Sequence, residues 1–219
     1  MKKAIFSFLT VLSLFSFKSG QTAKDTWHLK KFESGIAIYT RDAENSNLKE
    51  LKSVVFFKTS LTSIIALIDD FESYPQWVYR CGVSKTIKKN SDKDFIHYQS
   101  VTAPWPVDNR DFVVHVQLSQ DPATKVVTQT VTCIPDYIPK VEGHVRITEF
   151  KAKWTLTPLR NGTVEADYQL LVNPGGNIPA WLVNLAVIDG PFETALNMQT
   201  WIMKEKYQKA TNSYIKELE

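Results

Sequence analysis

The alternation of apolar and polar residues divides the chain into strands and two helical segments. Residues 35–40 and 48–57 alternate with the period of a strand, and the stretch from Gly82 to Asn173 is strand-like almost throughout. Within that stretch we predict strands at 83–88, 95–102, 111–118, 125–134, 144–159 and 163–172. Turn residues such as Asn161 and Gly162 separate them, so we expect consecutive strands to be antiparallel neighbours.

Helical spacing marks two segments outside the strands. The hydroxyl residues at 59 and 60 can cap a helix whose apolar residues recur at helical intervals over 61–68, and Tyr74-Pro75 ends it. A long C-terminal helix is predicted over about 178–218, kinked or divided at Gly190-Pro191. Its apolar stripe consists of Ile178, Leu182, Leu185, Phe192, Leu196, Met203 and Tyr207.

This order of elements predicts an α+β fold in which the helices are segregated from one antiparallel sheet. The chain has 219 residues and shows no repeat and no interdomain linker, which favours a single domain. A curved sheet with one amphipathic helix lying across it can leave an internal space. Small ligands tend to occupy such a space.

The N-terminal residues 1–20 have the pattern of a secretory signal peptide. Lys2 and Lys3 precede an uncharged, mostly apolar run that ends at Phe17. The run is shorter than the roughly 20 residues that a membrane span needs. Cleavage is expected between Gly20 and Ala23, which leaves a domain over 24–217 exported to the periplasm or the extracellular space.

Removal of this leader changes the charge of the chain. A cut after residue 20 takes away three lysines and no acid, so the formal charge falls from +3 to zero. A neutral mature chain without long basic runs gives no support for a nucleic-acid partner or an electrostatically held membrane surface. Export also permits a disulfide between Cys81 and Cys133, and two free, buried thiols are the alternative.

Sequence motifs of catalysis and of metal binding are absent. The four histidines are scattered, and the chain has no His-Glu-x-x-His, Cys-x-x-Cys, Gly-x-Ser-x-Gly or Gly-x-Gly-x-x-Gly motif. We therefore expect a non-enzymatic protein with no metal and no cofactor.

The strand after Pro104-Trp105-Pro106 presents an apolar face. Phe112 and every second residue after it are apolar, and Arg110 has the parity of this face, so we place Arg110 at its inner rim. Asp111 has the opposite parity and is expected to face outwards or to cap a turn. The face could be ordinary core or the wall of a cavity.

The strand from His144 has an arginine on its apolar side. Arg146 shares parity with Phe150 and Trp154, and burying it is costly unless it is paired or faces a polar head group. A β-bulge near Glu149 is the alternative, because it would return Val145 and Ile147 to the inner face instead.

These segments, taken in order, resemble the START family, the lipid-transfer domains related to the steroidogenic acute regulatory protein. The similarity extends over about residues 27–207. It rests on Trp27, on Gly35-Ile36-Ala37-Ile38-Tyr39, on Asp70-Phe71-Glu72-Ser73-Tyr74-Pro75-Gln76-Trp77, on Arg110-Asp111-Phe112-Val113, on Gly143-His144-Val145-Arg146, on Trp154 and on residues 174–184.

The resemblance implies a helix-grip fold, in which a curved antiparallel sheet wraps around the long C-terminal helix and encloses a hydrophobic tunnel. It implies binding and transfer of one lipid, acyl chain or sterol-like molecule, by a monomer that contacts membranes transiently. Sterol-binding members carry an acid and an arginine in the cavity, whereas 95–103 holds no acid here and the arginine's position falls on Val116. The expected ligand-binding residues are Tyr98, Arg110, Phe112, Val114, Val116, Arg146, Phe150, Trp154, Leu182, Leu185 and Leu196.

Two alternatives belong to other functional classes. The first is a helix-grip enzyme of cyclase or hydrolase type acting on an apolar substrate, with His97, His115 or Tyr98 as its acid–base group. The second is a ligand-free interaction domain in which the sheet simply packs on the helix. The volume of the interior separates the second alternative from lipid binding.

Overall fold

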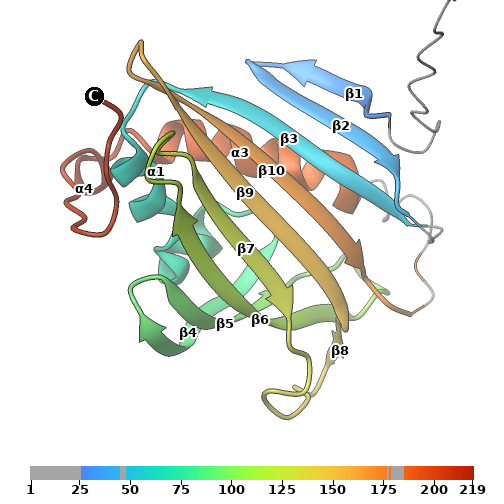
Figure 1. Ribbon diagram of the computed structural model, residues 1–219. Helices are drawn as coiled ribbons and strands as arrows, with labels where there is room; N and C mark the ends of the chain where they lie inside the picture. Colours follow the sequence, from blue (N-terminus) through green and yellow to red (C-terminus); the bar gives the residue numbers. More distant parts are fainter. Residues whose placement is uncertain (1–25, 45–47, 177, 179–184) are drawn as a thin grey trace, which may run out of the picture.

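The computed structural model describes residues 26–44, 48–176, 178 and 185–219. The expected signal peptide and its cleavage site lie outside these residues. In the described part of the chain ten strands form one curved sheet in the order β1-β2-β3-β10-β9-β7-β6-β5-β4, and β8 pairs with β6 beside this path (Figure 1). The strands are β1 (His28–Glu33), β2 (Ile36–Asp42), β3 (Lys49–Phe57), β4 (Cys81–Ser91), β5 (Asp94–Val101), β6 (Asn109–Gln120), β7 (Val127–Cys133), β8 (His144–Arg146), β9 (Glu149–Leu159) and β10 (Thr163–Asn173).

The predicted strands correspond to β2–β7, β9 and β10, and their neighbours in the sheet are antiparallel. Two features were not predicted. The edge strand β1 has an irregular register between Leu29 and Lys31, which breaks its alternation. The segment expected as one strand over 144–159 is divided at 147–148, and its first part, β8, runs parallel to β6.

The early helix begins where the sequence predicts and ends sooner. Helix α1 (Leu61–Ile68) is capped by Ser60, whose Oγ accepts a hydrogen bond of 3.1 Å from the backbone N–H of Ser63. It ends at Ile68, and a separate 3₁₀ turn (Phe71–Gln76) contains Pro75. The apolar face of α1 is completely buried, which anchors the helix to the rest of the core.

The long C-terminal helix predicted over 178–218 is shorter and divided. A π-helical turn (Leu185–Asp189) leads into α3 (Gly190–Trp201), and the short α4 (Glu205–Gln208) follows. Pro191 lies in the first turn of α3, where a missing N–H costs no hydrogen bond. Of the predicted apolar stripe, Met203 is 67% exposed just beyond the end of α3, whereas Tyr207 in α4 is buried.

The last residues of the chain fasten α1 to the sheet. The carboxylate of Glu217 accepts hydrogen bonds of 3.0 and 2.9 Å from the backbone N–H groups of Leu61 and Thr62. The Gln120 side chain exchanges two hydrogen bonds, of 2.7 and 2.9 Å, with the backbone of Lys216. This segment therefore supplies a second cap to α1 and ties it to the end of β6.

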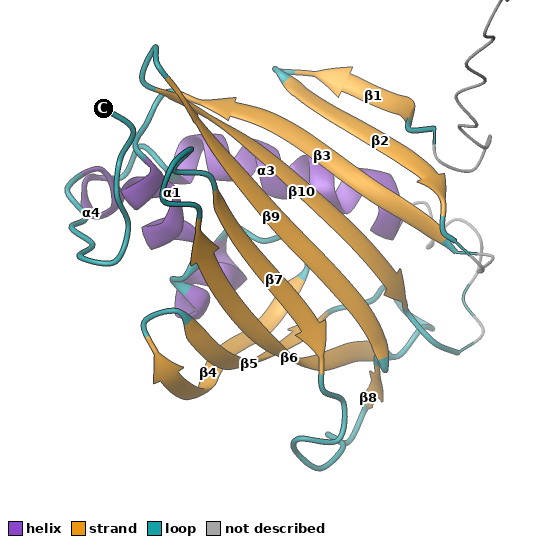
Figure 2. Ribbon diagram, in the orientation of Figure 1, coloured by secondary structure: helices purple, strands orange, loops and turns teal. Residues whose placement is uncertain are grey.

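The sheet curves around α3, which lies across its concave face, while α1 and α4 lie near one end of the sheet (Figure 2). The residues of α3 that face the sheet are buried, among them Phe192, Ala195 and Met198. No helix within the described ranges is long and apolar enough to cross a bilayer. The architecture confirms the predicted α+β helix-grip fold.

Candidate ligand-binding cavity

A largely apolar cavity of about 310 Å³ lies between the concave face of the sheet and α3. Its walls come from β3, β5, β6, β7, β9 and β10, with the 3₁₀ turn and α3 closing it. Alternate residues of each strand face inwards, because side chains of a strand point to opposite faces in turn. The volume lies at the lower end of the range of small-molecule sites, which is about 300–1,000 Å³.

The predicted inward face of β6 lines this cavity from Arg110 to Val116. Arg110, Phe112, Val114 and Val116 all contribute to the wall. From β9, Phe150 and Trp154 join them, and the rings of Phe112 and Phe150 stack with centroids 4.7 Å apart. Six of the eleven predicted residues are thus brought together, and each was found from the alternation of its own strand.

Tyr98 and Arg146 lie elsewhere and require a correction. On β5 the residues that face the cavity are His97, Gln99 and Val101, so Tyr98 points to the opposite face and packs with Val113. The side chain of Arg146 lies on the face of the sheet that is turned away from the cavity. Strand pairing is interrupted at residues 147–148, between β8 and β9, so Arg146 does not share a face with Phe150 and Trp154. Ile147 lines the cavity, as the alternative expected, but the irregularity is this interruption of the strand and not a bulge near Glu149.

Three of the expected ligand-binding residues belong to the predicted C-terminal helix. Leu182 lies outside the described residues, and so does the side chain of Leu185. Leu196 packs against the core formed by α1 and α3 and is not among the described residues that line the cavity.

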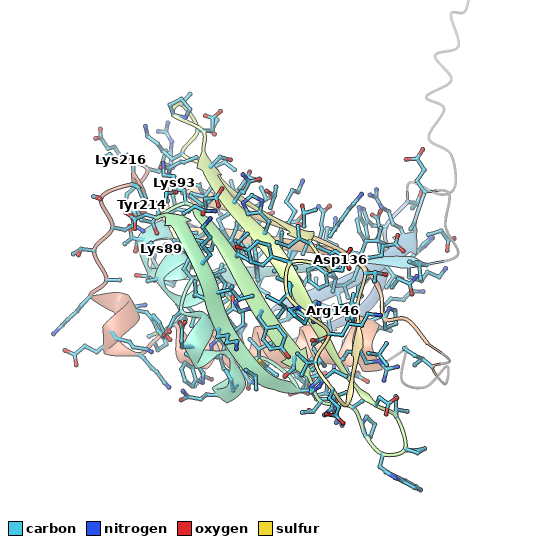
Figure 3. The ribbon with its side chains drawn as sticks, turned by 90° about the horizontal axis from the view of Figure 1, so that it is seen from below. Lys89, Lys93, Asp136, Arg146, Tyr214 and Lys216 are labelled. Carbon is cyan, nitrogen blue, oxygen red and sulfur yellow. The ribbon has the colours of Figure 1, made fainter. Side chains whose placement is uncertain are left out.

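Asp111 and Arg146 form a buried ion pair on the far side of β6. Nε and Nη2 of Arg146 donate to the two carboxylate oxygens of Asp111, each over 2.9 Å, and Asp111 is 0% exposed. Arg146 also donates to backbone carbonyls in the β7–β8 connection, including that of Pro139 at 3.1 Å. Asp111 therefore neither faces solvent nor caps a turn; it holds this connection, near which Figure 3 labels Arg146 and Asp136.

The groups named for an enzyme do not assemble into an acid–base pair. His97 lines the cavity, and burial lowers its pKa to about 4, so it is neutral at pH 7. His115 lies on the other face, where its Nε2 is 2.9 Å from Asp94 Oδ1. No aspartate or glutamate is among the described residues that line the cavity.

Several wall residues were missed by the sequence analysis. Trp77, Tyr79, Gln99 and Gln129 all line the cavity, and none of them was among the expected ligand-binding residues. The parity of β5 could have found Gln99, because it alternates with Val101.

Cys81 and Cys133 are both free thiols in the structure, and burial raises the pKa of Cys81 to about 12.

An acidic group lies behind the cavity wall. Gln129, which lines the cavity, donates a hydrogen bond of 2.7 Å from Nε2 to Asp69 Oδ1. Tyr214 of the C-terminal segment lies 3.5 Å from Asp69 Oδ2, and Lys89 is labelled near Tyr214 in Figure 3. Burial raises the pKa of Asp69 from 3.8 to about 7, although Gln129, Tyr214 and Lys89 each oppose that rise.

The raised pKa of Asp69 makes stability depend on pH. Between pH 4 and pH 7 the folded protein keeps a proton that the unfolded chain has lost, so stability falls as pH rises through this window. We expect Asp69→Asn to remove this loss, because the amide keeps the hydrogen bond from Gln129 without the charge. Between pH 5 and pH 8 the wild type should lose about 1–2 kcal/mol more than the variant, after allowance for partial exposure. Urea unfolding at both pH values measures the difference, and equal losses would contradict the assignment.

A curved antiparallel sheet that wraps around a C-terminal helix and encloses an apolar cavity defines the helix-grip class of ligand-binding folds. The START domain family model matches residues 16–202, and the chain belongs to this family.

The relatives are proteins of similar length. The chain is 32% identical over 193 residues to an uncharacterized protein of Pseudomonas aeruginosa, which covers 88% of this chain and 95% of the relative. It is 29% identical over 170 residues to the phosphatidylcholine transfer protein of Mus musculus, covering 75% of this chain and 78% of that protein. A STAR-related lipid transfer protein from Xanthomonas axonopodis has a similar structure, with a TM-score of 0.75, 34% identity, and coverage of 81% and 99%.

Proposed function

We propose that this protein binds one lipid molecule in the cavity beneath α3 and carries it between membranes, without catalysing a reaction. The observation that carries the proposal is a 310 Å³ apolar cavity at the centre of a START domain. Transfer of a methylene group from water into such a cavity contributes about 0.8 kcal/mol, so part of one acyl chain gives useful affinity. A ligand-free interaction domain would fill this space with its own side chains.

An acyl-chain lipid fits better than a sterol. The similarity to phosphatidylcholine transfer proteins supports a phospholipid or another acyl lipid as the ligand. The inward face of β5 carries His97 and Gln99 and no acid, and Val116 occupies the position at which sterol-binding members have an arginine.

Contact with a membrane is part of the proposal. Trp105 is 91% exposed on the β5–β6 connection, and Ala103 of the same connection lines the cavity. Tryptophan is favoured at the boundary between lipid and water, so a side chain in this place suits a transient contact during loading. We place the protein outside the cytoplasm on the pattern of residues 1–20.

Lipid identification tests the proposal. Mature protein, purified without added lipid, is analysed by mass spectrometry under non-denaturing conditions, and the extracted ligand is then identified. We expect one lipid per protein chain, and we expect the emptied protein to move that lipid between donor and acceptor vesicles. A protein that stays empty after incubation with vesicles of its ligand class would contradict binding, and binding without movement would contradict transfer alone.

A further inference from the structure

We propose that Arg110 binds an anionic oxygen of the ligand, so that the protein selects lipids that carry a phosphate or a carboxylate group. The inference rests on the proposed function and assigns the chemical class of the ligand in the same cavity. Its starting point is the buried guanidinium of Arg110, in which one N–H group has no hydrogen-bond acceptor among the described residues.

Arg110 is buried and faces the cavity. The residue is 7% exposed and belongs to the cavity wall. Its Nη1 donates to the backbone carbonyl of Asp108, while its Nε has no hydrogen-bond partner in the described part of the chain. A buried N–H of a charged group without an acceptor costs stability, so its retention points to an acceptor supplied from outside the protein.

The carboxylate nearest in sequence is already engaged. Asp111 points to the opposite face of β6, where both of its oxygens are bonded to Arg146. No ion pair joins Arg110 to an acid among the described residues. The charge of Arg110 therefore reaches the cavity without a counter-ion from the described part of the chain.

The two arginines that line the cavity, Arg80 and Arg110, lie at the same end of it. Arg110 pairs with Val101 across β5 and β6, and the next residue, Thr102, donates a 2.8 Å hydrogen bond from its N–H to the carbonyl of Arg80. Arg80 also lines the cavity. A Cβ atom built on Gly176 would lie 3.9 Å from Arg110 Nη2, so the segment after β10 passes beside the guanidinium.

The inward face of β6 becomes apolar with distance from this end. Phe112, Val114 and Val116 continue the inward face of β6 beyond Arg110. A ligand with one anionic group and a hydrocarbon chain matches this arrangement: its oxygen accepts from the guanidinium of Arg110 and neutralises the charge, and its chain covers the apolar wall. A phosphodiester and a fatty-acid carboxylate share this chemistry, whereas diacylglycerol and fatty alcohols lack it.

Matched lipid pairs test the assignment. Binding of dioleoylphosphatidylcholine is compared with that of dioleoylglycerol, and binding of oleic acid with that of oleyl alcohol, for the wild type, Arg110→Met and Arg160→Met. Arg160 is exposed and lies outside the cavity, so its variant controls for loss of one positive charge. In at least one pair the wild type should favour the lipid that carries the phosphate or carboxylate group on the order of ten- to a hundredfold, and only Arg110→Met should abolish this preference.

The two lipid pairs separate the sources of the anionic oxygen. Preference confined to the first pair identifies a phosphate ligand, and preference confined to the second identifies a carboxylate. Equal binding within both pairs, or an unchanged preference in Arg110→Met, overturns the role of Arg110 while lipid binding itself stands. Failure of the wild type to bind any of the four lipids contradicts the proposed function for these lipids and the inference with it.

Stability distinguishes a ligand-binding role from a structural one. Because Arg110 is incompletely paired, Arg110→Met should lower the melting temperature of the empty protein by no more than about 3 °C. A larger loss would show that Arg110 supports the fold. Arg110→Lys, which keeps the charge, then serves as the binding test: it should retain a weakened preference for the anionic lipid, and complete retention would exclude a role for Nε.

Discussion

Replacement of Arg146 by methionine is expected to destabilise the protein by about 3–5 kcal/mol, because it leaves the Asp111 carboxylate buried without a partner. The pair has two parallel hydrogen bonds of 2.9 Å, and Asp111 has no access to solvent. Arg146 also satisfies carbonyl groups of the β7–β8 connection, so the variant loses the contacts that hold this connection against β6.

A double-mutant cycle with Asp111→Asn measures the ionic part of this loss. Urea unfolding of the wild type, both single variants and the double variant gives four free energies of unfolding. Once asparagine has removed the negative charge, Arg146→Met should cost less than it does in the wild type. Strict additivity of the two substitutions would refute a charge-dependent interaction, and Arg160→Met should be close to neutral throughout.

Filling the cavity is expected to abolish lipid binding while preserving the fold. Ala152 is buried on the inward face of β9, where it lines the cavity beside Trp154. An indole at this position occupies space that the ligand needs, and excluding four methylene groups costs about 3 kcal/mol, which is more than a hundredfold in affinity. We therefore expect Ala152→Trp to purify without lipid and to bind added lipid at least a hundredfold more weakly.

The control for this variant lies on the same strand. Thr155 faces away from the cavity and pairs with Thr128 and Asp167 in the sheet. Thr155→Trp introduces the same side chain outside the cavity, so its lipid binding should equal that of the wild type. Lipid binding is measured by titration, and circular dichroism verifies the fold of both variants. Wild-type affinity in Ala152→Trp would show that the ligand lies elsewhere.

Much of the fold follows from local patterns in the sequence. Strict alternation identified β6, and helical spacing behind a serine cap identified the start of α1, because both signals arise from neighbouring residues. The division between β8 and β9 could not be found in this way. Its cause is a contact between Asp111 and Arg146, 35 positions apart in the sequence, which outweighs the alternation of the segment itself.

The part of the candidate site that lies on a single strand could be predicted, because the alternation of residues along a strand determines which side chains share a face. Phe112, Val114 and Val116 share a face in any regular strand, so they line the cavity together. Trp77 and Tyr79 lie between elements, where no periodicity exists to orient them. The unpaired state of Arg110 depends on what surrounds its Nε in space, and the sequence contains no local signal of that kind.

The bond between Glu217 and α1 has a consequence for the order of events during protein synthesis. Thr62 donates to a carboxylate that lies 155 residues later in the chain. At about 5–20 residues per second, the ribosome adds that carboxylate roughly 10–30 s after the helix has been made. An isolated helix of eight residues is not stable in water, so the Ser60 cap alone does not hold α1 during this interval, and the helix becomes stable when the strands cover its apolar side.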